Sequence, residues 1–538
     1  MKKLFYLPAL AAALFFSSCS SDEPAGSTNG EVNENGGYLA VNIMAAGGSR
    51  ATSSATDFED GTPTENEATK GLFLFYDDNG NPTQTPQLVN LEWNNTPSNA
   101  PQIENISKAV VVVAGKTQPT QMLVILNPGN LQLAGLNLET ARNKVADYAT
   151  GLTTKGSFIM TNSAYALANN STLVKSTSLK DAKFYESEEA ATQGQDAVQV
   201  YVERVVAKIE TSNTVNDLNI SNSDVTLVPD EDGQNPTPIK IEPVVNGIEV
   251  ANVATTSFLF KNINNLAAWY SAWNEVNDFE NKRCYWAGFP TDLKVANHSW
   301  NDINGATNQK FTTYVQENTQ MEHPTAIIIA ATLTNTKTNE AQDLIRWSDN
   351  YYKPERFKSA IATFVQNGGF MVKETVDGVE KLRSVKPEEV DYITDTQHEE
   401  LVKAGKIEAY HSVGCIADAA KTLAFVKADG TPATVEEINT HLQTLANRFL
   451  YWKGGKTYYY VNIEHFGDKT ESIDFGTGVV RNHIYRLTLN SISGLGTPVF
   501  NPKEIINPQK PDDKIFRMRA QINILKWRIV NQTVDFGK

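Results

Sequence analysis

The sequence predicts a mainly β protein made of antiparallel β-sandwiches with a few short helices. Many segments are rich in β-branched and aromatic residues, which favour strands. Apolar residues alternate with other residues at Leu39, Val41 and Ile43, which is the pattern of a strand with one buried face. Strand patterns also follow one another with few intervening helices, whereas a doubly wound parallel sheet requires regular alternation of strands and helices.

The expected elements beyond residue 70 are mainly strands. The run 71–82 closes on Asn79-Gly80, which is a strong hairpin signal. Thr434 followed by Glu437 resembles a helix N-cap with a capping box. The other expected strands cover 108–115, 122–127, 197–210, 325–334, 457–466, 483–492 and 520–530. The expected helices cover 138–149, 264–276, 352–367 and 434–450.

Length and charge narrow the class of protein. The chain has 538 residues, which is enough for two or three domains with cores of their own. Its 47 Lys and Arg residues against 62 Asp and Glu residues give a net charge of −15, and no basic run stands out. This balance argues against nucleic acid or an anionic membrane surface as a partner. We place the domain boundary near residue 265, between domains over 51–265 and 266–538.

The N-terminus resembles a bacterial lipoprotein signal. Lys2 and Lys3 precede an apolar run that is too short to span a bilayer, and the run ends in Ser17-Ser18-Cys19. This arrangement predicts a signal peptide over 1–18 and lipidation of Cys19. The polar, acidic run that follows is typical of a disordered tether. We therefore expect an exported precursor that is anchored through lipid on Cys19.

The other two cysteines are Cys284 and Cys415. They could form one disulfide in an oxidising compartment, or they could stay as two buried thiols. Their spacing does not distinguish these alternatives.

The sequence carries no recognised catalytic, metal-binding or cofactor-binding motif. His398, in HEELVKAG, has no second histidine at the spacing of a zinc protease, and no nucleophile elbow, P-loop or dinucleotide motif occurs. The acidic runs 77–80 and 230–233 lack the remaining positions of a calcium loop, so turn chemistry explains them better. We expect no enzyme, no metal and no cofactor.

The two ends of the chain complement each other. The alternating strand near the N-terminus is followed by Gly47-Gly48-Ser49-Arg50, and Arg50 is the sole basic residue between Lys3 and Lys70. Cleavage between Arg50 and Ala51 would free the strand for removal and leave an open apolar groove.

The tail, residues 515–538, follows a Pro-containing linker and could fill that groove in a second molecule, as in β-augmentation. The alternative is that the tail is the last strand of its own domain. The tail residues expected to fill the groove are Ile522, Ile524, Trp527, Ile529, Val530, Val534 and Phe536.

Several longer stretches resemble the fimbrillins of the FimA/Mfa type, the subunits of type V pili, and most closely the major subunit of Mfa-type short fimbriae. Besides the lipobox at Cys19, the stretches are GSRAT at 48–52, GSFIMTNSAY at 156–165, VYVERVVAKIE at 200–210, TYYYVNIEHFG at 457–467, GVVRNHIYRLTLNSISGLGTPVF at 478–500 and AQINILKWRIVNQTVDF at 520–536.

The resemblance implies two transthyretin-like β-sandwich domains and export as an outer-membrane lipoprotein. It implies a propeptide over 19–50 that contains lipidated Cys19 and the removable strand, with cleavage after Arg50 by a trypsin-like, Arg-specific protease. It also implies polymerisation by insertion of the C-terminal strand. The expected product is the shaft of a cell-surface fimbrium that supports adhesion and biofilm formation.

The partners that follow from the resemblance are further copies of the chain, anchor and tip subunits, and receptors on host or bacterial surfaces. The intact tail favours a shaft subunit, since an anchor subunit is expected to lack it. The alternatives are a tip or minor subunit of the same fimbria, or a surface glycan-binding lipoprotein. Trp269, Trp273 and Trp286 could stack on a sugar, although at these spacings tryptophans more often fill a core.

Overall fold

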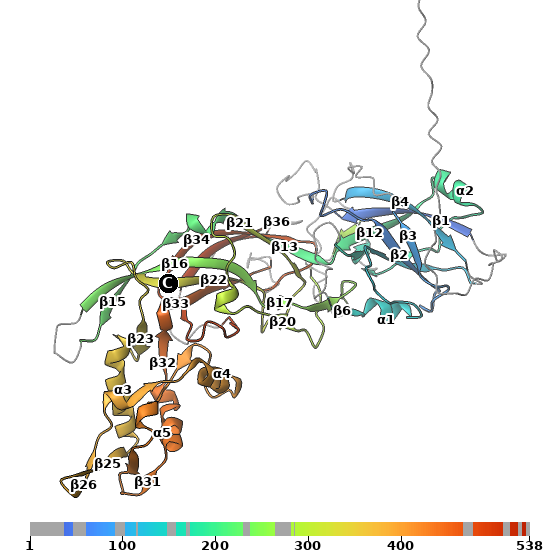
Figure 1. Cartoon of the computed structure of the whole chain (residues 1–538). Coiled ribbons are helices and arrows are strands. Elements are labelled where there is room, and N and C mark those ends of the chain that lie inside the picture. The colour runs from blue at the N-terminus through green and yellow to red at the C-terminus, as the bar shows by residue number, and fades with distance from the viewer. Residues whose placement is uncertain are drawn as a thin grey trace, which may run out of the picture.

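The computed structural model describes residues 37–46, 61–91, 103–114, 117–147, 158–167, 173–229, 237–263, 281–283, 286–465, 477–508, 517–525 and 530–533. The protein is mainly β with a few short helices, as the sequence predicts. Figure 1 shows two β-sheet bodies in a row and a smaller α/β lobe that projects from the second body.

The N-terminal sandwich is built from one sheet that curves around its own core. Apolar side chains from strands that lie far apart in the sheet, such as Val41, Phe75 and Val111, meet in a single buried cluster. The strands of this sheet, in spatial order, are β4 (Ile103–Val113), β1 (Gly37–Ala46), β12 (Val198–Arg204), β7 (Met160–Asn162), β5 (Gln121–Leu126), β2 (Lys70–Tyr76) and β3 (Gln87–Asn90). Two short strands, β11 (Phe184–Tyr185) and β10 (Thr177–Ser178), pair with β1 and β5, and the helices α1 (Leu138–Arg142) and α2 (Glu188–Gln193) lie beside the sheet.

The C-terminal sandwich consists of two sheets that face each other across one core. Ile209 and Leu487 from the first sheet and Ile329 and Tyr459 from the second belong to the same buried cluster. The first sheet has the order β21 (Lys310–Gln316), β13 (Val206–Thr214), β34 (Ile484–Ser493), β36 (Arg517–Leu525) and β37 (Val530–Thr533), with β14 (Asn219–Ile220) beside β34. The second has the order β28 (His411–Ser412), β32 (Phe449–Trp452), β23 (Leu344–Trp347), β24 (Asn350–Tyr352), β15 (Ser223–Leu227), β16 (Thr237–Ala251), β22 (Ala326–Asn335), β33 (Lys456–Asn462) and β35 (Thr497–Pro498).

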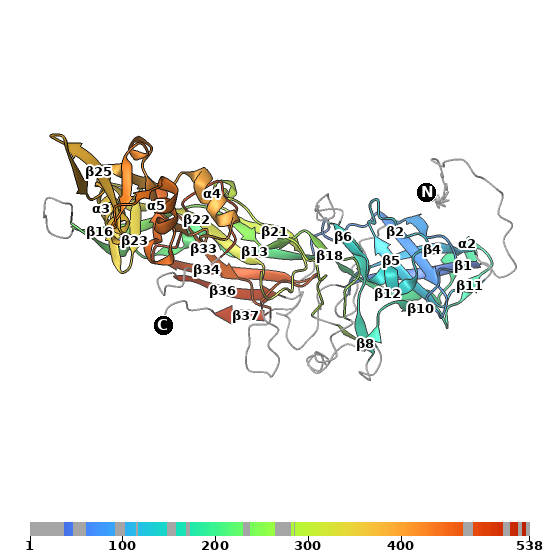
Figure 2. The same cartoon turned by 90° about the horizontal axis from the view of Figure 1, so that it is seen from below.

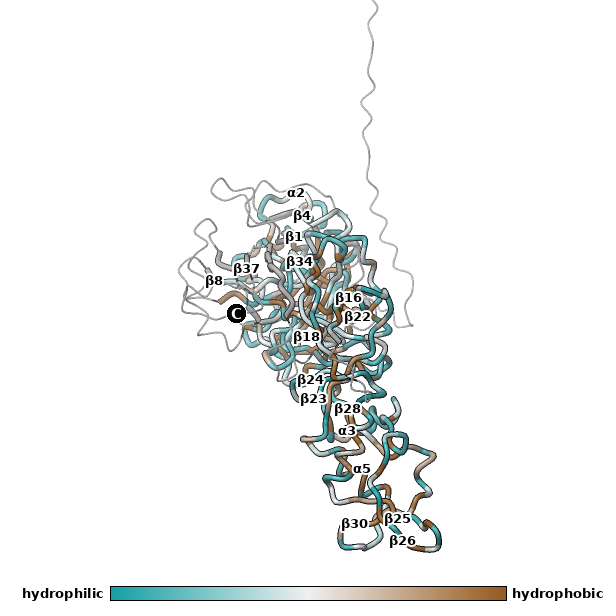
Figure 3. Tube along the Cα trace, turned by 90° about the vertical axis from the view of Figure 1, so that its left-hand side faces the viewer, coloured by the Kyte–Doolittle hydropathy of each residue, from teal (hydrophilic) through white to brown (hydrophobic). Residues whose placement is uncertain are grey.

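The α/β lobe, residues 353–448, is inserted between β24 and β32. Phe357, Ile361 and Ile438 of the lobe belong to a buried cluster that also includes Ile345 of β23 and Tyr451 of β32, so the lobe shares this core with the second sandwich. The lobe projects to one side when the molecule is viewed along the row of domains (Figure 3). Its elements are α3 (Pro354–Asn367), β25 (Phe370–Val376), β26 (Val379–Arg383), β27 (Val390–Tyr392), α4 (Asp395–Lys403), β29 (Gly414–Ile416), β30 (Ala424–Lys427), β31 (Pro432–Ala433) and α5 (Val435–Leu442).

The chain passes from the first sandwich to the second at Val205, between β12 and β13. It returns later, because β18 (Thr256–Phe258) pairs with β6 (Val145–Asp147), and β19 (Asn281–Arg283) pairs with β8 (Tyr165–Leu167), which also pairs with β9 (Leu173–Val174). β17 (Val253–Ala254), just before the first return, pairs with β20 (Val295–Ala296), which follows the second. The crossing therefore lies well before the boundary expected near residue 265. The apolar strand pattern continues through Val205 without a break, so it carries no boundary signal.

Most of the expected elements are present, and two helices are shorter than expected. The Asn79-Gly80 turn forms between β2 and β3, with Gly80 at φ 77° and the Asp77 carboxylate accepting the Asn79 and Asn81 N–H groups. The helix expected over 138–149 ends at Arg142, because β6 pairs with β18. The helix expected over 434–450 ends at Leu442, because Phe449 begins β32. The helix expected over 264–276 lies outside the described residues.

Candidate functional site

The strand expected to be removable, β1, lies inside the N-terminal sheet rather than at its edge. On one side β4 pairs with it in antiparallel fashion, from Gly37 opposite Val113 to Ala46 opposite Ile103. On the other side β1 pairs first with β11 and then, over residues 41–45, in parallel with β12. Any occupant of this position therefore completes two ladders at once.

The side chains of β1 form part of the N-terminal core. Leu39, Val41 and Ile43 are 0%, 1% and 0% exposed and belong to the buried cluster inside the curved sheet. Ala40, on the opposite face, packs with Tyr185 and with Ala191 of α2. The strand expected at these residues is confirmed, with Leu39, Val41 and Ile43 on a buried face, but its opposite face is also covered at Ala40. Loss of the strand would open a groove lined by apolar side chains.

The neighbouring strand β4 depends on β1 more than β12 does. Among the residues that the structure describes, β1 is the only strand that pairs with β4, whereas β12 also pairs with β7. A second attachment of β4 comes from Gln84, whose side chain bonds the Val112 carbonyl and the Ala114 N–H. Without an occupant in the β1 position, β4 loses its whole backbone ladder.

The expected donor strand pairs within its own chain. β36 lies antiparallel to β34, with Ile522 opposite Leu487 and Ile524 opposite Tyr485, and β37 continues the sheet with Val530 opposite Ile524 (Figure 2). In this structure the tail thus extends a sheet of its own domain, which is the arrangement that the sequence left open as the alternative. Trp527, Ile529, Val534 and Phe536 lie outside the described residues, as do Cys19, Arg50 and Ala51.

A buried polar cluster holds the segment that follows the expected processing site. Residues 61–66 lie at the junction of the two sandwiches, where the Arg204 Nε donates to the Glu65 carbonyl at 2.9 Å. The same guanidinium bonds the side chains of Asn66 and Asn482, the latter at 3.1 Å from Nη1. These hydrogen bonds connect residues 61–66 to Arg204 at the end of β12, and Arg204 in turn connects them to Asn482, two residues before β34 begins.

Glu65 is the centre of this cluster and is 2% exposed. Its carboxylate lies 3.1 Å from the Lys208 Nζ of β13 and accepts hydrogen bonds from the Tyr314 hydroxyl of β21 and, at 2.6 Å, from the Thr62 N–H. Burial alone would raise the pKa of Glu65, but the hydrogen bonds from Tyr314 and Thr62 and the charge of Lys208 lower it to about 2. The carboxylate is therefore ionised at neutral pH.

The sequence did not predict this cluster. Glu65 and Tyr314 are 249 residues apart in the chain, and Arg204 and Asn482 are 278 apart. The sequence feature that comes nearest to predicting the cluster is Arg204, a charged residue at the end of an apolar strand. A buried arginine needs polar partners, but its position in the sequence does not show which residues these are.

Three further features of the described residues concern metal binding, the thiol of Cys415 and helix length. They contain no group of three or more His, Cys, Asp or Glu residues that could hold a metal ion. Cys415 is a free buried thiol, and burial raises its pKa to about 11, so it is protonated and unreactive at neutral pH. No helix within the described ranges is long and apolar enough to cross a membrane.

Comparison with known proteins identifies the C-terminal part of the chain. Residues 450–533 match the family model described as "Major fimbrial subunit protein type IV, Fimbrillin, C-terminal". This range covers β32, β33 and β34 and continues to the end of β37. A comparison with curated proteins gives no match.

Solved structures with similar folds include three fimbrial proteins from Porphyromonas gingivalis. The fimbrilin FimA of strain W83 is 13% identical, with a TM-score of 0.37 over 92% of this chain and 98% of that chain. The tip fimbrial protein Mfa3 is 12% identical, with a TM-score of 0.30 over 92% and 99%. The fimbrial anchor protein Mfa2 is 7% identical, with a TM-score of 0.24 over 64% and 95%. All three TM-scores lie below 0.5, so these likenesses carry no argument, and the similarity to fimbrillins rests on the match over 450–533.

Proposed function

The chain carries a fimbrillin C-terminal region, and from this premise we propose that the protein is the structural shaft subunit of a cell-surface fimbrium. In this proposal the precursor is exported as a lipoprotein anchored in the outer membrane through Cys19. A trypsin-like protease then cleaves after Arg50, and β1 leaves with the propeptide. The C-terminal strand of another copy takes its place, and anchor and tip subunits complete the fibre, which supports adhesion to surface receptors and biofilm formation.

The observation that carries the proposal is the position of β1. It is a strand upstream of the candidate processing site, yet it supplies three almost fully buried side chains to the core, Leu39, Val41 and Ile43. Burying side chains of this size is worth about 1.5–3 kcal/mol each. A subunit without β1 exposes the corresponding groove to water, and this cost favours capture of a replacement strand.

The C-terminal strand has the length and spacing that such a replacement needs. β36 has 9 residues and β1 has 10. Ala520, Ile522 and Ile524 recur at every second position, as Leu39, Val41 and Ile43 do. We therefore place Ile522 and Ile524 in two of the positions that the β1 side chains vacate.

The direction of insertion follows from the two flanking strands. A donor that runs in the direction of β1 is antiparallel to β4 along a full-length ladder and parallel to β12 over a shorter one. Antiparallel pairs are slightly more stable per residue than parallel pairs. We therefore propose that the donor runs in the same direction as β1.

The tail has to leave its place beside β34 before it can act as a donor. The exchange gives up the ladders of β36 with β34 and with the short β37, and it gains ladders with β4 and β12, which flank the β1 position on its two edges. Release of an inserted strand then requires breaking both ladders together, so slow unfolding keeps the fibre intact.

The N-terminal residue of protein recovered from surface filaments tests this proposal. We expect Ala51, because Arg50 is the sole basic residue between Lys3 and Lys70. Arg50→Ala should leave uncleaved, monomeric precursor at the cell surface, whereas the neighbouring control Ser49→Ala should be cleaved and form filaments. Normal filaments built from the Arg50→Ala protein would overturn the proposal.

A further inference from the structure

The segment that leads into the C-terminal arm is held firmly by the second sandwich. We call residues 497–507 the arm root. The Val499 N–H donates to the Lys456 carbonyl at 3.0 Å, and the Ile506 N–H donates to the His298 carbonyl at 2.9 Å. At the far end of the root, the Asn507 side chain accepts a hydrogen bond from Asn297 at 3.1 Å. The root is thus fastened along its length and not only where β35 begins.

The α/β lobe also contacts the arm root. His398 of α4 is 0% exposed, and its Nδ1 lies 2.8 Å from the Glu504 carboxylate of the root. Its Nε2 lies 2.9 Å from the His411 carbonyl, which accepts a hydrogen bond, so this nitrogen donates. The imidazole ring also stacks on Phe500, with a centroid distance of 4.8 Å and an interplanar angle of 24°.

Lys453, which follows β32 in the second sandwich, contacts both the lobe and the arm root. Lys453 forms an ion pair with Asp395, the first residue of α4, at 2.7 Å. The same ammonium lies 4.5 Å from the centroid of the Phe500 ring, within the range of a cation–π contact. Phe500 is 2% exposed, so the lobe and the sandwich together enclose it.

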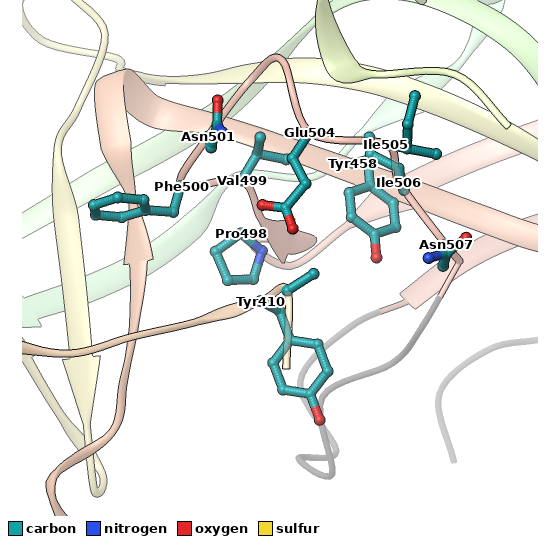
Figure 4. A pocket seen from close by; sticks show the side chains of 11 residues that line it. Tyr410, Tyr458, Pro498, Val499, Phe500, Asn501, Glu504, Ile505, Ile506 and Asn507 are labelled. Carbon is teal, nitrogen blue, oxygen red and sulfur yellow. The ribbon is translucent and has the colours of Figure 1, made fainter. Parts of the chain in front are cut away.

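A small cavity lies beside the arm root. Figure 4 shows the Glu504 carboxylate between Pro498 and Tyr458, with Tyr410 on the other side. The cavity between these side chains measures about 20 Å³, which is room for about one water molecule. The hydrogen bonds at Val499 and Ile506 and the burial of Phe500 therefore hold the root in place, while Ile505 is 50% exposed.

From these contacts we propose that the α/β lobe braces the arm root, so that the C-terminal arm moves out to a second copy of the chain only beyond Asn507. The inference rests on the proposed donor-strand function and adds that the arm turns about a fixed point at Asn507, which we call the pivot. Ten peptide units separate Asn507 from Arg517, the first residue of β36. A chain of this length spans at most about 35 Å. The donor can therefore reach only a β1 groove that lies within that distance of the pivot.

Two engineered disulfides test the pivot, one on each side of it. Ser299 and Ile505 form an antiparallel bridge between the sandwich and the root, and Thr488 lies opposite Gln521 in the β34–β36 ladder. Directly opposed residues of this kind have Cα atoms about 4.5–5.5 Å apart, which suits a disulfide. The variants are Ser299→Cys with Ile505→Cys and Thr488→Cys with Gln521→Cys, each cleaved at Arg50 and measured by light scattering under oxidising and reducing conditions.

We expect the 299–505 disulfide to leave the polymer mass unchanged and the 488–521 disulfide to abolish polymerisation until it is reduced. Each reduced variant is the control for its own oxidised form. Loss of polymers only in the oxidised 299–505 variant would overturn the pivot, because the root would then have to move. Polymers from the oxidised 488–521 variant would instead overturn the donor-strand function, since the strand would never have left β34.

The contribution of the lobe is tested by hydrogen exchange. In His398→Leu we expect the Val499 and Ile506 amides to exchange at least ten-fold faster, while amides of β22 keep their rates and show that the fold is intact. Glu504→Gln removes the carboxylate that His398 contacts without changing α4 and should act in the same direction. The control Glu400→Gln, at an exposed position of α4, should change nothing. Unchanged exchange of both root amides in Glu504→Gln would overturn the brace.

Discussion

At the scale of single residues, Glu65 connects residues 61–66 to both sandwiches. Its contribution depends on charge, because the ionised carboxylate pairs with Lys208 and accepts the Tyr314 hydroxyl. We expect Glu65→Gln to lower the free energy of unfolding at pH 7 by about 1–3 kcal/mol, the usual range for a buried hydrogen bond to a charged group.

The pH dependence of this difference has a defined sign. The pKa of Glu65 is lowered from 4.5 to about 2 in the folded protein, so the carboxylate stabilises the fold above pH 4.5 and loses this effect as the pH falls toward 2. Urea unfolding of wild type and Glu65→Gln at several pH values should give free energies that converge below pH 4.5. A difference that stays constant down to pH 2.5 would contradict this account.

Gly61 leaves room for the same cluster. A Cβ at this position would lie 2.6 Å from the Arg204 Nη2 and 2.7 Å from the Asn66 Oδ1, which is closer than atoms tolerate. We expect Gly61→Ala to lower the thermal midpoint by several degrees. Gly288→Ala is the control, since its nearest neighbours lie at 3.6 Å, an ordinary contact, and its midpoint should stay within about one degree of wild type. Equal midpoints for both variants would show that the Arg204 contacts do not stabilise the junction.

Residue-level predictions succeeded where the relevant neighbours are close in sequence. The capping box of α5 was readable because Thr434 and Glu437 are three residues apart, and the structure shows both of its hydrogen bonds. The His398–Glu504 contact was not readable, because its partners are 106 residues apart. Nothing local marks either residue as half of a pair.

At the scale of secondary-structure elements, β4 reports whether the β1 position is filled. Its ladder with β1 is lost when β1 leaves, whereas β34 keeps its parallel ladder with β13. In the cleaved monomer we expect β4 amides to exchange within seconds to minutes, and we expect protection to return on polymerisation. Amides of β13 and β22 should stay protected in both states. A protected β4 in the cleaved monomer would mean that β1 had stayed in place.

The strands were predictable as elements, but their pairing was not. The alternation at Leu39, Val41 and Ile43 indicated a buried strand, and the structure places all three in the core. The same pattern does not tell whether a strand pairs in its own sheet or in that of a neighbour, because side-chain alternation is identical in both. The tail is the clearest case, since β36 pairs with β34 in this chain and yet has the spacing of β1.

At the scale of the whole molecule, the sequence indicated two β-sandwiches but not the α/β lobe between β24 and β32. The helices over 352–367 and 434–450 were expected individually, yet nothing local shows that they pack into one buried cluster against β23 and β32 of the sandwich. Phe357, Ile361 and Ile438 meet there only because of contacts between residues far apart in the chain. The crossing at Val205 was missed for a related reason, since one apolar pattern runs through both domains.

The most direct test of the central claim is the mass, by light scattering and electron microscopy, of subunits cleaved after Arg50 with and without residues 509–538. The full-length cleaved protein should form filaments. The truncated protein should stay monomeric, keep the circular dichroism spectrum of a folded β protein, and bind one synthetic peptide of residues 515–538. Filaments from the truncated protein would contradict donor-strand polymerisation. A truncated protein that cannot fold would contradict it as well, because the tail would then be the last strand of its own domain.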